Sequence, residues 1–415
     1  MAEVSLFKNH FFGNFPKRNT QAAATCSPFT ENNSEPRSIK KIFIVCGEPS
    51  GDLLAANLVT AIGKLAPQIR FFGVGGLQLA KTQTEIFCNI NELAVMGFFD
   101  VLKKLPRFLK LKKTILEQIA IQKPDCLILV DFSGFNLRLA KTVNKRIPVI
   151  YYVSPQVWAS REGRINCIKK FISMMVVLFK FEEEFYRQRQ IQSTCAGHPL
   201  IDLVKPVSEK QDFLDSFGIN PAKKIVALLP GSRKQEIKLI LPLMLKSAQL
   251  INKEIADTQF IIAKSPNLDT RIYLKECKNF ALDLKIVDGR AGDCLNIAQA
   301  SLVCSGTATL EAAIIAKPFV IVYKTNLLNY LLYRPQVKIP YIGMVNIVAG
   351  KKIVPEFIQF GARPDIIAKS IIELLSDPLS ANRMSQNLKT VKDSLGQPGA
   401  SVRAAKLILD FLRQQ

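Results

Sequence analysis

Short apolar runs alternate along this chain with segments long enough to form helices, and this alternation limits the fold more than any other feature of the sequence. The first series of runs comprises IFIVC (42–46), IRFFGV (69–74), CLILV (126–130), VIYYV (149–153) and MMVVLF (174–179). Continuous apolar runs of this length are typical of strands buried on both faces, as in a parallel sheet that is covered by helices. The first half of the chain therefore predicts a parallel α/β domain.

A second series begins after residues 204–223, a charged stretch that contains Pro206, Gly218 and Pro221. Its apolar runs are IVALLP (225–230), FIIAK (260–264), KIVD (285–288), SLVCS (301–305) and FVIVY (319–323). We therefore expect an α/β protein of two doubly wound, Rossmann-like domains that face a cleft. The predicted parts are a first domain over 39–205, a second domain over 206–385, and C-terminal helices over 386–415. One arrangement open to these helices is to pack back on the first domain.

Residues 1–38 are rich in Asn, Ser, Thr, Phe and Pro and have no clear period. We expect them to form a disordered extension. An organelle transit peptide is the alternative, which Lys8, Lys17 and Arg18 favour and three interspersed glutamates oppose. The N-terminus lacks the continuous apolar stretch of a secretory signal, and no run approaches the roughly 18 apolar residues that a spanning helix needs.

The charge balance predicts an anionic partner. Lysine and arginine number 56 against 34 aspartates and glutamates, a net charge of +22. Such an excess attracts nucleic acid, an anionic membrane surface or phosphorylated substrates. A metal site is not expected, because the chain has only His10 and His198 and none of its nine cysteines lies in a CxxC pair.

Two motifs in the first half follow strands, where ligands bind in open parallel sheets. GEPSGD (47–52) contains two glycines that permit a tight turn, with Ser50 or Asp52 available to cap the next helix. A simple turn and cap is an equally good interpretation of this motif. VDFSGFN (130–136) places Asp131 at a strand end, where a carboxylate can act as a general base or merely cap the next helix.

Two motifs in the second half predict an anion site. In PGSRKQE (230–236), Gly231 and Ser232 form a small turn and Arg233 stands where a helix begins, so that free backbone amides and a guanidinium can bind a phosphate or diphosphate. SGTATLE (305–311) repeats this arrangement with Ser305, Gly306 and Thr307. Glu311 lies on the same face as Thr307, where a carboxylate can accept hydrogen bonds from a vicinal diol such as that of a ribose. An ordinary solvated position is the alternative for Glu311.

Together these segments resemble the lipid-A-disaccharide synthases, a family of two-domain glycosyltransferases of the GT-B class. The segments that carry the resemblance are CGEPSGD (46–52), FFGVGG (71–76), ELAVMGFFDVL (92–102), PDCLILVDFSGFN (124–136), YYVSPQVWASR (151–161), FEEEFY (181–186), GHP (197–199), ALLPGSRKQEI (227–237), SGTATLE (305–311) and MVNIVAGKKIVPE (344–356). The chain departs from the family at Gly134, where a second aspartate is common, at Pro49, where a small polar residue is usual, and in having one tryptophan where the YVSP segment often has two.

The resemblance implies a reaction between UDP-2,3-diacylglucosamine and 2,3-diacylglucosamine 1-phosphate, which gives a β-1,6-linked disaccharide 1-phosphate and UDP with inversion and without a metal or other cofactor. Asp131 would be the base, with Glu48 as second choice. Arg233 and the two helix N-termini would stabilise the leaving UDP, as an enzyme without a metal requires. Glu311 would hold the ribose, and Asn346 would hold the donor.

The segment 98–116 predicts a contact with membrane lipid. It combines six cations with the apolar residues Phe98, Phe99, Leu102, Leu105, Phe108 and Leu109, a composition typical of interfacial segments. Pro106 is expected to interrupt any helix here. An ordinary amphipathic helix packed on the sheet is the alternative. The predicted location is the cytoplasmic face of the inner membrane, with an organelle address left open, and a homodimer is compatible with the sequence.

Two other functions compete with this one. Another GT-B enzyme or an epimerase that acts on a UDP-sugar would share the fold, but the MGFFDVL and YVSP segments favour the acyl-sugar family. A basic nucleic-acid-binding protein would suit the charge. No helix-turn-helix, zinc-finger or RNP-like motif is visible in the sequence, so we expect no nucleic-acid partner.

Overall fold

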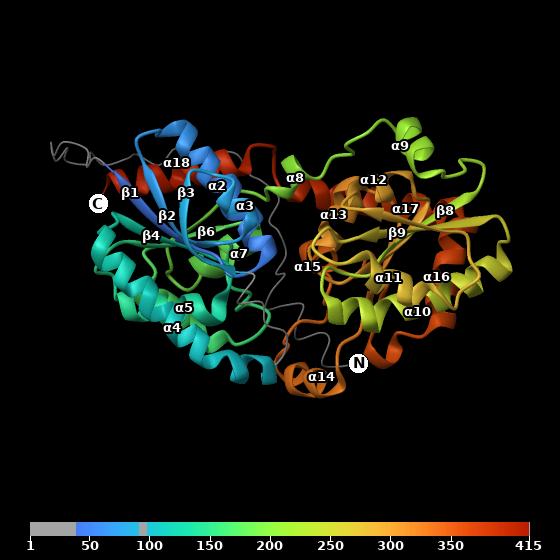
Figure 1. Ribbon diagram of the computed structural model, residues 1–415, viewed down its shortest axis with the longest axis horizontal. Coiled ribbons are helices and arrows are strands. Elements are labelled where there is room, and N and C mark those ends of the chain that lie inside the picture. The colour runs from blue at the N-terminus through green and yellow to red at the C-terminus, as the bar shows by residue number, and fades with distance from the viewer. Residues whose placement is uncertain (1–38, 91–97, 415) are drawn as a thin grey trace, which may run out of the picture. The chain divides into compact units, whose positions relative to one another are not determined.

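The computed structural model describes residues 39–90 and 98–414, without the side chains of residues 98–105 and 333 (Figure 1). The predicted N-terminal extension therefore lies outside the described residues. Residues Ile39–Gln415 form one unit of contacts.

The first half of this unit is built on a parallel sheet of seven described strands in the order β3-β2-β1-β4-β5-β6-β7. The strands are β1 (Lys41–Val45), β2 (Arg70–Gly75), β3 (Thr84–Asn89), β4 (Cys126–Val130), β5 (Val149–Tyr152), β6 (Met174–Val177) and β7 (Ser193–Cys195). The order reverses between β1 and β4, which is the topological switch point of a doubly wound sheet. Glu48 follows β1 and Asp131 follows β4, so both lie at this point.

The second half repeats the design with six described strands in the order β10-β9-β8-β11-β12-β13, again all parallel. The strands are β8 (Lys224–Leu229), β9 (Thr258–Lys264), β10 (Leu284–Asp288), β11 (Ala300–Cys304), β12 (Phe319–Tyr323) and β13 (Glu356–Ile358). The switch point lies between β8 and β11, which the motifs at Gly231–Arg233 and Ser305–Thr307 follow. The prediction of two doubly wound domains is confirmed.

Helices alternate with the strands in both halves (Figure 1). In the first half they are α2 (Pro49–Leu65), α3 (Leu77–Ala80), α4 (Phe98–Gln122), α5 (Ser133–Val143), α6 (Ile165–Phe171), α7 (Lys180–Arg187) and α8 (Leu200–Leu203). In the second half and at the C-terminus they are α9 (Lys210–Phe217), α10 (Lys234–Glu254), α11 (Thr270–Cys277), α12 (Ala291–Ile297), α13 (Ala308–Ile315), α14 (Leu327–Tyr333), α15 (Met344–Ala349), α16 (Pro364–Ser376), α17 (Pro378–Ser394) and α18 (Ala400–Arg413). Pro49 is tolerated in the first turn of α2 because no helical hydrogen bond needs its missing N–H.

Both faces of the first sheet are buried, which explains why its central strands are apolar at every position. Ile42 and Ile44 face a core cluster that includes residues of α2, while Phe43 and Val45 face a second cluster that includes Leu111 of α4. The last helix, α18, packs against α2 with Ala404, Ala405, Ile408, Leu409 and Leu412. Helix α17 instead contributes Met384, Leu388 and Val391 to the core of the second half. The chain therefore returns to the first sheet through residues 395–399.

The expected interruption at Pro106 is wrong, because α4 runs as one helix from Phe98 to Gln122 with Pro106 inside it. A proline inside a helix costs about 3 kcal/mol, and packing on the sheet offsets this cost. Leu111 and Ile115 are buried in the core, and Phe108 contacts the rings of Phe132 and Phe135.

Asp52, which was expected as a possible cap of α2, instead caps the neighbouring helix α3. Its side chain is buried, and its two oxygens accept hydrogen bonds from the backbone N–H groups of Gly76 (2.7 Å), Gln78 (2.8 Å) and Leu79 (3.2 Å). The carboxylate ties the turn after β1 to the turn after β2, and the helix N-terminus favours its negative charge.

We predict that Asp52→Ala lowers the free energy of unfolding by about 2–4 kcal/mol, because three backbone donors, two of them buried, lose their acceptor. Urea denaturation of the purified protein measures this change. Ser50→Ala in the same turn is the matched control and is expected to change stability by less than about 0.5 kcal/mol. Equal effects of the two substitutions would contradict the assignment.

Candidate active site

Two charged side chains from the two halves of the chain meet in an ion pair. Glu48 immediately precedes α2, and Arg233 immediately precedes α10. Nη2 of Arg233 lies 3.1 Å from Oε2 of Glu48, with both side chains nearly half exposed. An exposed ion pair contributes only about 0–1 kcal/mol. The pair therefore marks where two strand-end loops meet and contributes little to stability.

Two amides at the start of α10, those of Ser232 and Arg233, are not free, contrary to the expectation from PGSRKQE. Oε2 of Glu236 accepts hydrogen bonds from the backbone N–H groups of Ser232 (3.0 Å) and Arg233 (3.2 Å). Oε1 of Glu236 lies 3.4 Å from Nη1 of Arg233. The reason is a reciprocal helix cap, in which a carboxylate one turn into the helix reaches back to its N-terminus. An anion that binds here must compete with Glu236.

Gly231 makes that cap possible. Its φ of +111° lies in a region that favours glycine, and a Cβ atom at this position would lie 2.3 Å from Oε2 of Glu236. Gly231 thus acts through the backbone and through the space it leaves.

Asp131 occupies a strained, half-buried position at the end of β4. Its φ is +48° and that of Phe132 is +45°, left-handed values that non-glycine residues adopt at a free-energy cost and that cluster at functional sites. Burial and, to a lesser extent, the negative charge of Glu48 raise the pKa of Asp131 to about 7, while the amide of Phe132 and the cation of Arg233 act in the opposite direction. A carboxylate with this pKa suits proton abstraction near neutral pH.

Two residues that the sequence did not single out hold the Asp131 backbone. Nδ2 of Asn136, which is fully buried, donates to the carbonyl oxygen of Asp131 at 2.9 Å, and the Tyr151 hydroxyl donates to the same oxygen. Asn136 lies within the VDFSGFN segment, so a buried polar residue one turn into an apolar helix was the available signal. No sequence signal connects Tyr151 with Asp131, because their contact depends on the pairing of β4 with β5.

The ring of Phe132 fills the space beside Gly47. A Cβ atom at Gly47 would lie 2.2 Å from this ring. The same ring packs against Phe108 and Phe135, with ring centroids 6.0 and 5.4 Å away. Gly47 therefore allows the β1 and β4 loops to approach each other closely, which brings Glu48 near Asp131.

The loop after β11 offers a more open helix N-terminus. The Ser305 hydroxyl donates to the carbonyl oxygen of Ile342 at 3.2 Å, whereas Gly306 and Thr307 are exposed. Within the part of the chain that the structure describes, no acceptor takes the amide protons of these two residues. The turn before α13 therefore retains free amide donors, whereas Ser232 and Arg233 in the turn before α10 donate theirs to Glu236.

Glu311 lies in the first turn of α13 and is half-buried. Burial raises its pKa. Among the described residues, none donates a hydrogen bond to its carboxylate. A partly desolvated carboxylate without a donor is available to accept hydrogen bonds from a ligand.

Asn346 was expected to hold the donor, but its side chain is not available for a direct contact with a ligand. Its side chain is fully buried in α15. Nδ2 donates to the Val354 carbonyl and to Oε1 of Glu356, both at 2.8 Å, and Oδ1 accepts from the amides of Ile353 (2.9 Å) and Val354 (3.0 Å). All the hydrogen-bonding groups of this amide are in use, so the side chain orders the segment before β13.

The residues predicted to contact acyl chains differ in whether the structure describes their side chains and in how exposed those side chains are. The side chains of Phe98, Phe99, Leu102 and Leu105 lie outside the described residues. Phe108 is half-buried against the rings beside Asp131, and Leu109 is 60% exposed. Leu109 alone among the described members of this set presents a largely free apolar surface.

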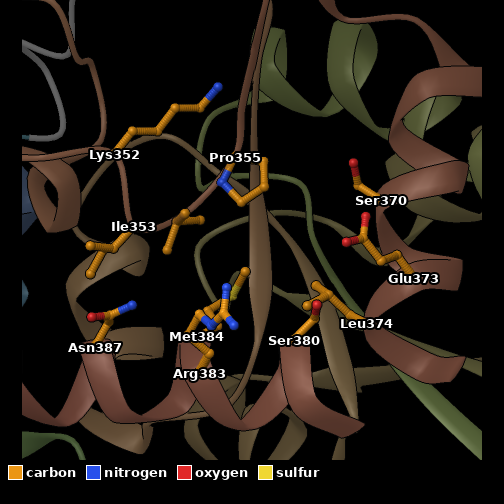
Figure 2. A pocket seen from close by; sticks show the side chains of 11 residues that line it. Lys352, Ile353, Pro355, Ser370, Glu373, Leu374, Ser380, Arg383, Met384 and Asn387 are labelled. Carbon is orange, nitrogen blue, oxygen red and sulfur yellow. The ribbon is translucent and has the colours of Figure 1, made fainter. Parts of the chain in front are cut away.

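A cavity of about 320 Å³ lies between α16, α17 and the segment before β13, where Asn346 bonds to two of its lining residues, Ile353 and Val354 (Figure 2). Pro355 in its wall precedes β13, and Met384 contacts the first residue of β12, so the cavity lies at the amino ends of these strands. In the described part of the chain, no group of three or more His, Cys, Asp or Glu side chains is placed to hold a metal ion. No described helix is long and apolar enough to cross a membrane.

Solved structures with the same fold include UDP-sugar enzymes. MnaA from S. aureus, solved with UDP, matches with a TM-score of 0.62 at 14% identity over 90% of this chain and 97% of that one. The UDP-GlcNAc 2-epimerase from Neisseria meningitidis, bound to UDP-GlcNAc, matches with a TM-score of 0.61 at 12% identity over 90% and 100%. At such identities the likeness shows the fold alone, the two-domain arrangement shared with GT-B glycosyltransferases.

Sequence comparisons separate this chain from the epimerases. It is 39% identical over 378 residues to the lipid-A-disaccharide synthase of Syntrophus aciditrophicus, covering 90% of this chain and 98% of the relative. It is 37% identical over 387 residues to that of Geobacter sulfurreducens, covering 93% and 100%. The model of the lipid-A-disaccharide synthetase family matches residues 42–409. The chain therefore belongs to the lipid-A-disaccharide synthase family of glycosyltransferases.

Proposed function

We propose that this enzyme transfers a 2,3-diacylglucosamine unit from its UDP derivative to the 6-hydroxyl of 2,3-diacylglucosamine 1-phosphate, with Asp131 as the general base. The observation that carries the proposal is the group formed by Asp131, Glu48 and Arg233 at the switch points of the two sheets. Inverting transfer needs a base on one side and a stabilised leaving group on the other. The base belongs to the first half and the cation to the second.

Asp131 takes the proton of the acceptor hydroxyl as the new glycosidic bond forms. Its backbone is held by Asn136 and Tyr151, so the carboxylate needs little reorganisation. Glu48 is the alternative base, but it is exposed and paired with Arg233, and its negative charge helps to keep the pKa of Asp131 near neutral.

Arg233 binds the diphosphate and stabilises the charge that develops on UDP. In the structure its guanidinium is shared by Glu48 and Glu236. A diphosphate carries more charge than either carboxylate and matches the planar fork of an arginine. The amides of Gly306 and Thr307 add donors at the α13 N-terminus, and Glu311 accepts hydrogen bonds from the ribose. Asn346 contributes by ordering the neighbouring segment.

We predict that Asp131→Asn, which keeps the size of the side chain, lowers turnover about 10²–10⁴-fold because the base is lost. The measurement is chromatography of the disaccharide product after incubation with both acyl-sugar substrates, alongside thermal melts to establish that the variant is folded. If the folded variant kept nearly wild-type turnover, Asp131 would not be the base and Glu48 would become the candidate.

The pH profile provides a control that separates the two carboxylates. Because the base must be ionised, kcat/KM should increase with pH, with the midpoint of this acidic limb of the profile near pH 7. In Glu48→Gln a nearby negative charge is lost, so the limb should move to lower pH while activity persists at neutral pH. The roles of the two carboxylates would be exchanged if Glu48→Gln abolished activity while Asp131→Asn left the pH dependence of kcat/KM unchanged.

We predict that Arg233→Lys weakens UDP binding about tenfold and that Glu311→Gln weakens it by a smaller factor. A lysine cannot form the paired hydrogen bonds of a guanidinium, and a glutamine offers the ribose one acceptor oxygen in place of two. Titration calorimetry with UDP measures both effects, with the exposed Arg271→Lys as control. Unchanged affinity in both variants would exclude these residues from the donor site.

We propose further that the enzyme works at an anionic membrane surface, since both substrates are amphiphiles. In addition to Leu109 of α4, a second apolar surface lies on α14 and on Phe360, whose ring meets Tyr330 edge-on at 6.0 Å. Its exposed members are Leu327, Leu328, Leu331, Leu332 and Phe360, at 41–71% exposure. The segment 324–363 holds six lysines and arginines and one glutamate. Clustered cations beside exposed apolar residues fit anionic headgroups.

We predict that Leu328→Ser combined with Leu331→Ser reduces binding to vesicles of phosphatidylglycerol and phosphatidylcholine about tenfold, because two partly inserted side chains are lost. Cosedimentation at low and high salt measures binding. Leu274→Ser combined with Leu379→Ser, which alters two leucines that are as exposed elsewhere, is the matched control. Equal binding by all three proteins would argue against this surface.

A further inference from the structure

The carboxylate of Glu182 is buried between α7 and the loop that follows β5. Glu182 is only 3% exposed. Its Oε2 accepts hydrogen bonds from the amides of Leu178 (3.3 Å) and Phe179 (3.4 Å), and its Oε1 accepts one from Nε1 of Trp158 at 3.1 Å. Burying a carboxylate without a paired cation costs several kcal/mol. Burial accordingly raises the pKa of Glu182 to about 7. A residue that never ionises caps a helix without that cost, so capping alone does not account for an ionisable group here.

Trp158 connects this carboxylate to the loop 154–162, which we call the bridging loop. The indole is buried at 6% exposure and meets the ring of Phe181 edge-on, with centroids 5.0 Å apart. Core packing surrounds the indole, and its hydrogen bond to Glu182 adds a directional contact that relates it to α7. Tyr186 of the same helix holds the start of the loop, through the Ser154 hydroxyl (2.7 Å) and the Pro155 carbonyl oxygen (3.3 Å). The bond to Glu182 holds the middle of the loop.

The bridging loop carries polar contacts to the second half of the chain. The amide of Lys338 donates to the carbonyl oxygen of Ala159 at 2.9 Å, and Nζ of Lys338 lies 2.9 Å from Oε2 of Glu162. Nε of Arg161 donates to Oε1 of Gln336 at 3.1 Å. A displacement of the loop would thus displace residues 336–338 as well.

Both ends of this connection lead to the proposed active site. Beyond residues 336–338, the carbonyl oxygen of Ile342 accepts the hydrogen bond of Ser305, at the head of the proposed donor loop. On the other side, Nη1 of Arg164, just after the bridging loop, donates to the Ser133 hydroxyl at 2.9 Å. Ser133 is two residues from Asp131.

We propose that Glu182 is a positioning residue for the transfer reaction. Through Trp158 it holds the bridging loop in the place where that loop joins the Ser305 loop of the second half to the Asp131 loop of the first. Glu182 does not reach the substrates. Its effect is on the distance between base and donor, a distance to which turnover is steeply sensitive.

The test is Glu182→Gln in the full-length enzyme, with Glu184→Gln as the matched control. A glutamine has one acceptor oxygen, so it cannot serve both Trp158 and the two amides. Glu184 lies on the same helix with an exposed side chain that pairs with Arg187. Trp158 is the only tryptophan of the chain, so its fluorescence reports directly on the environment of the bridging loop.

We predict that Glu182→Gln lowers kcat about 10–100-fold while UDP affinity, measured by calorimetry, stays within about twofold of wild type. The emission of Trp158 should change at the same time. Glu184→Gln should match wild type in all three measurements. Unchanged kcat per folded molecule, or a loss of UDP affinity as large as the loss of kcat, would overturn the positioning role.

Trp158→Phe tests the same bond and does so alone if Glu182→Gln does not fold, because it keeps an aromatic ring, although a smaller one, against Phe181 and removes the indole N–H. It should lower kcat to a similar extent, and the double variant should lose no more than either single one. Fully additive losses would overturn the proposal. The kinetic readout rests on the proposed reaction, and a wild-type enzyme that forms no disaccharide would refute that reaction. A Glu182→Gln enzyme of normal kcat would refute only the positioning role.

Discussion

The burial of parallel strands on both faces is the constraint on which the rest of this structure depends. Each connection between parallel strands must cross a face of the sheet, and a helix makes this crossing. The described strands of each sheet therefore all point the same way. All the loops at the carboxyl ends therefore lie along one edge. Where the strand order reverses, between β1 and β4 and between β8 and β11, neighbouring loops diverge and leave room for a ligand. The motifs with chemical character follow these four strands.

The charges at these loops are arranged as competing partners. Arg233 is shared by two carboxylates, and one of them, Glu236, also takes the amides that would receive a phosphate. Asp131 is kept near neutral pKa by burial and by Glu48. The site thus holds its cation with its own anions, and in the proposed reaction a diphosphate would enter by exchange with them. Exchange of one ion pair for another avoids exposing an unpaired charge.

Sequence patterns predicted ten of the thirteen described strands, and the three they missed share a physical reason. β3, β7 and β13 are edge strands with half-buried, partly polar residues, so they lack the continuous apolar run that marks a central strand. Pro106 misled in the opposite direction, since tertiary packing held α4 together across a residue that breaks isolated helices. Asn346 lies in a segment that the sequence singled out. Its buried hydrogen bonds to Ile353 and Val354, however, depend on how the chain folds back before β13.

By itself, the sequence determined the parallel α/β architecture, the family and the strand ends that carry the chemistry, because these follow from local apolar patterning and from motifs contiguous in the chain. Only the tertiary structure decided which charges meet. Glu48 and Arg233 are 185 residues apart in sequence and 3.1 Å apart in space, and Trp158 and Glu182 come from different strand–helix units. Such contacts depend on loop closure and on the packing of whole layers, which no local pattern of residues encodes.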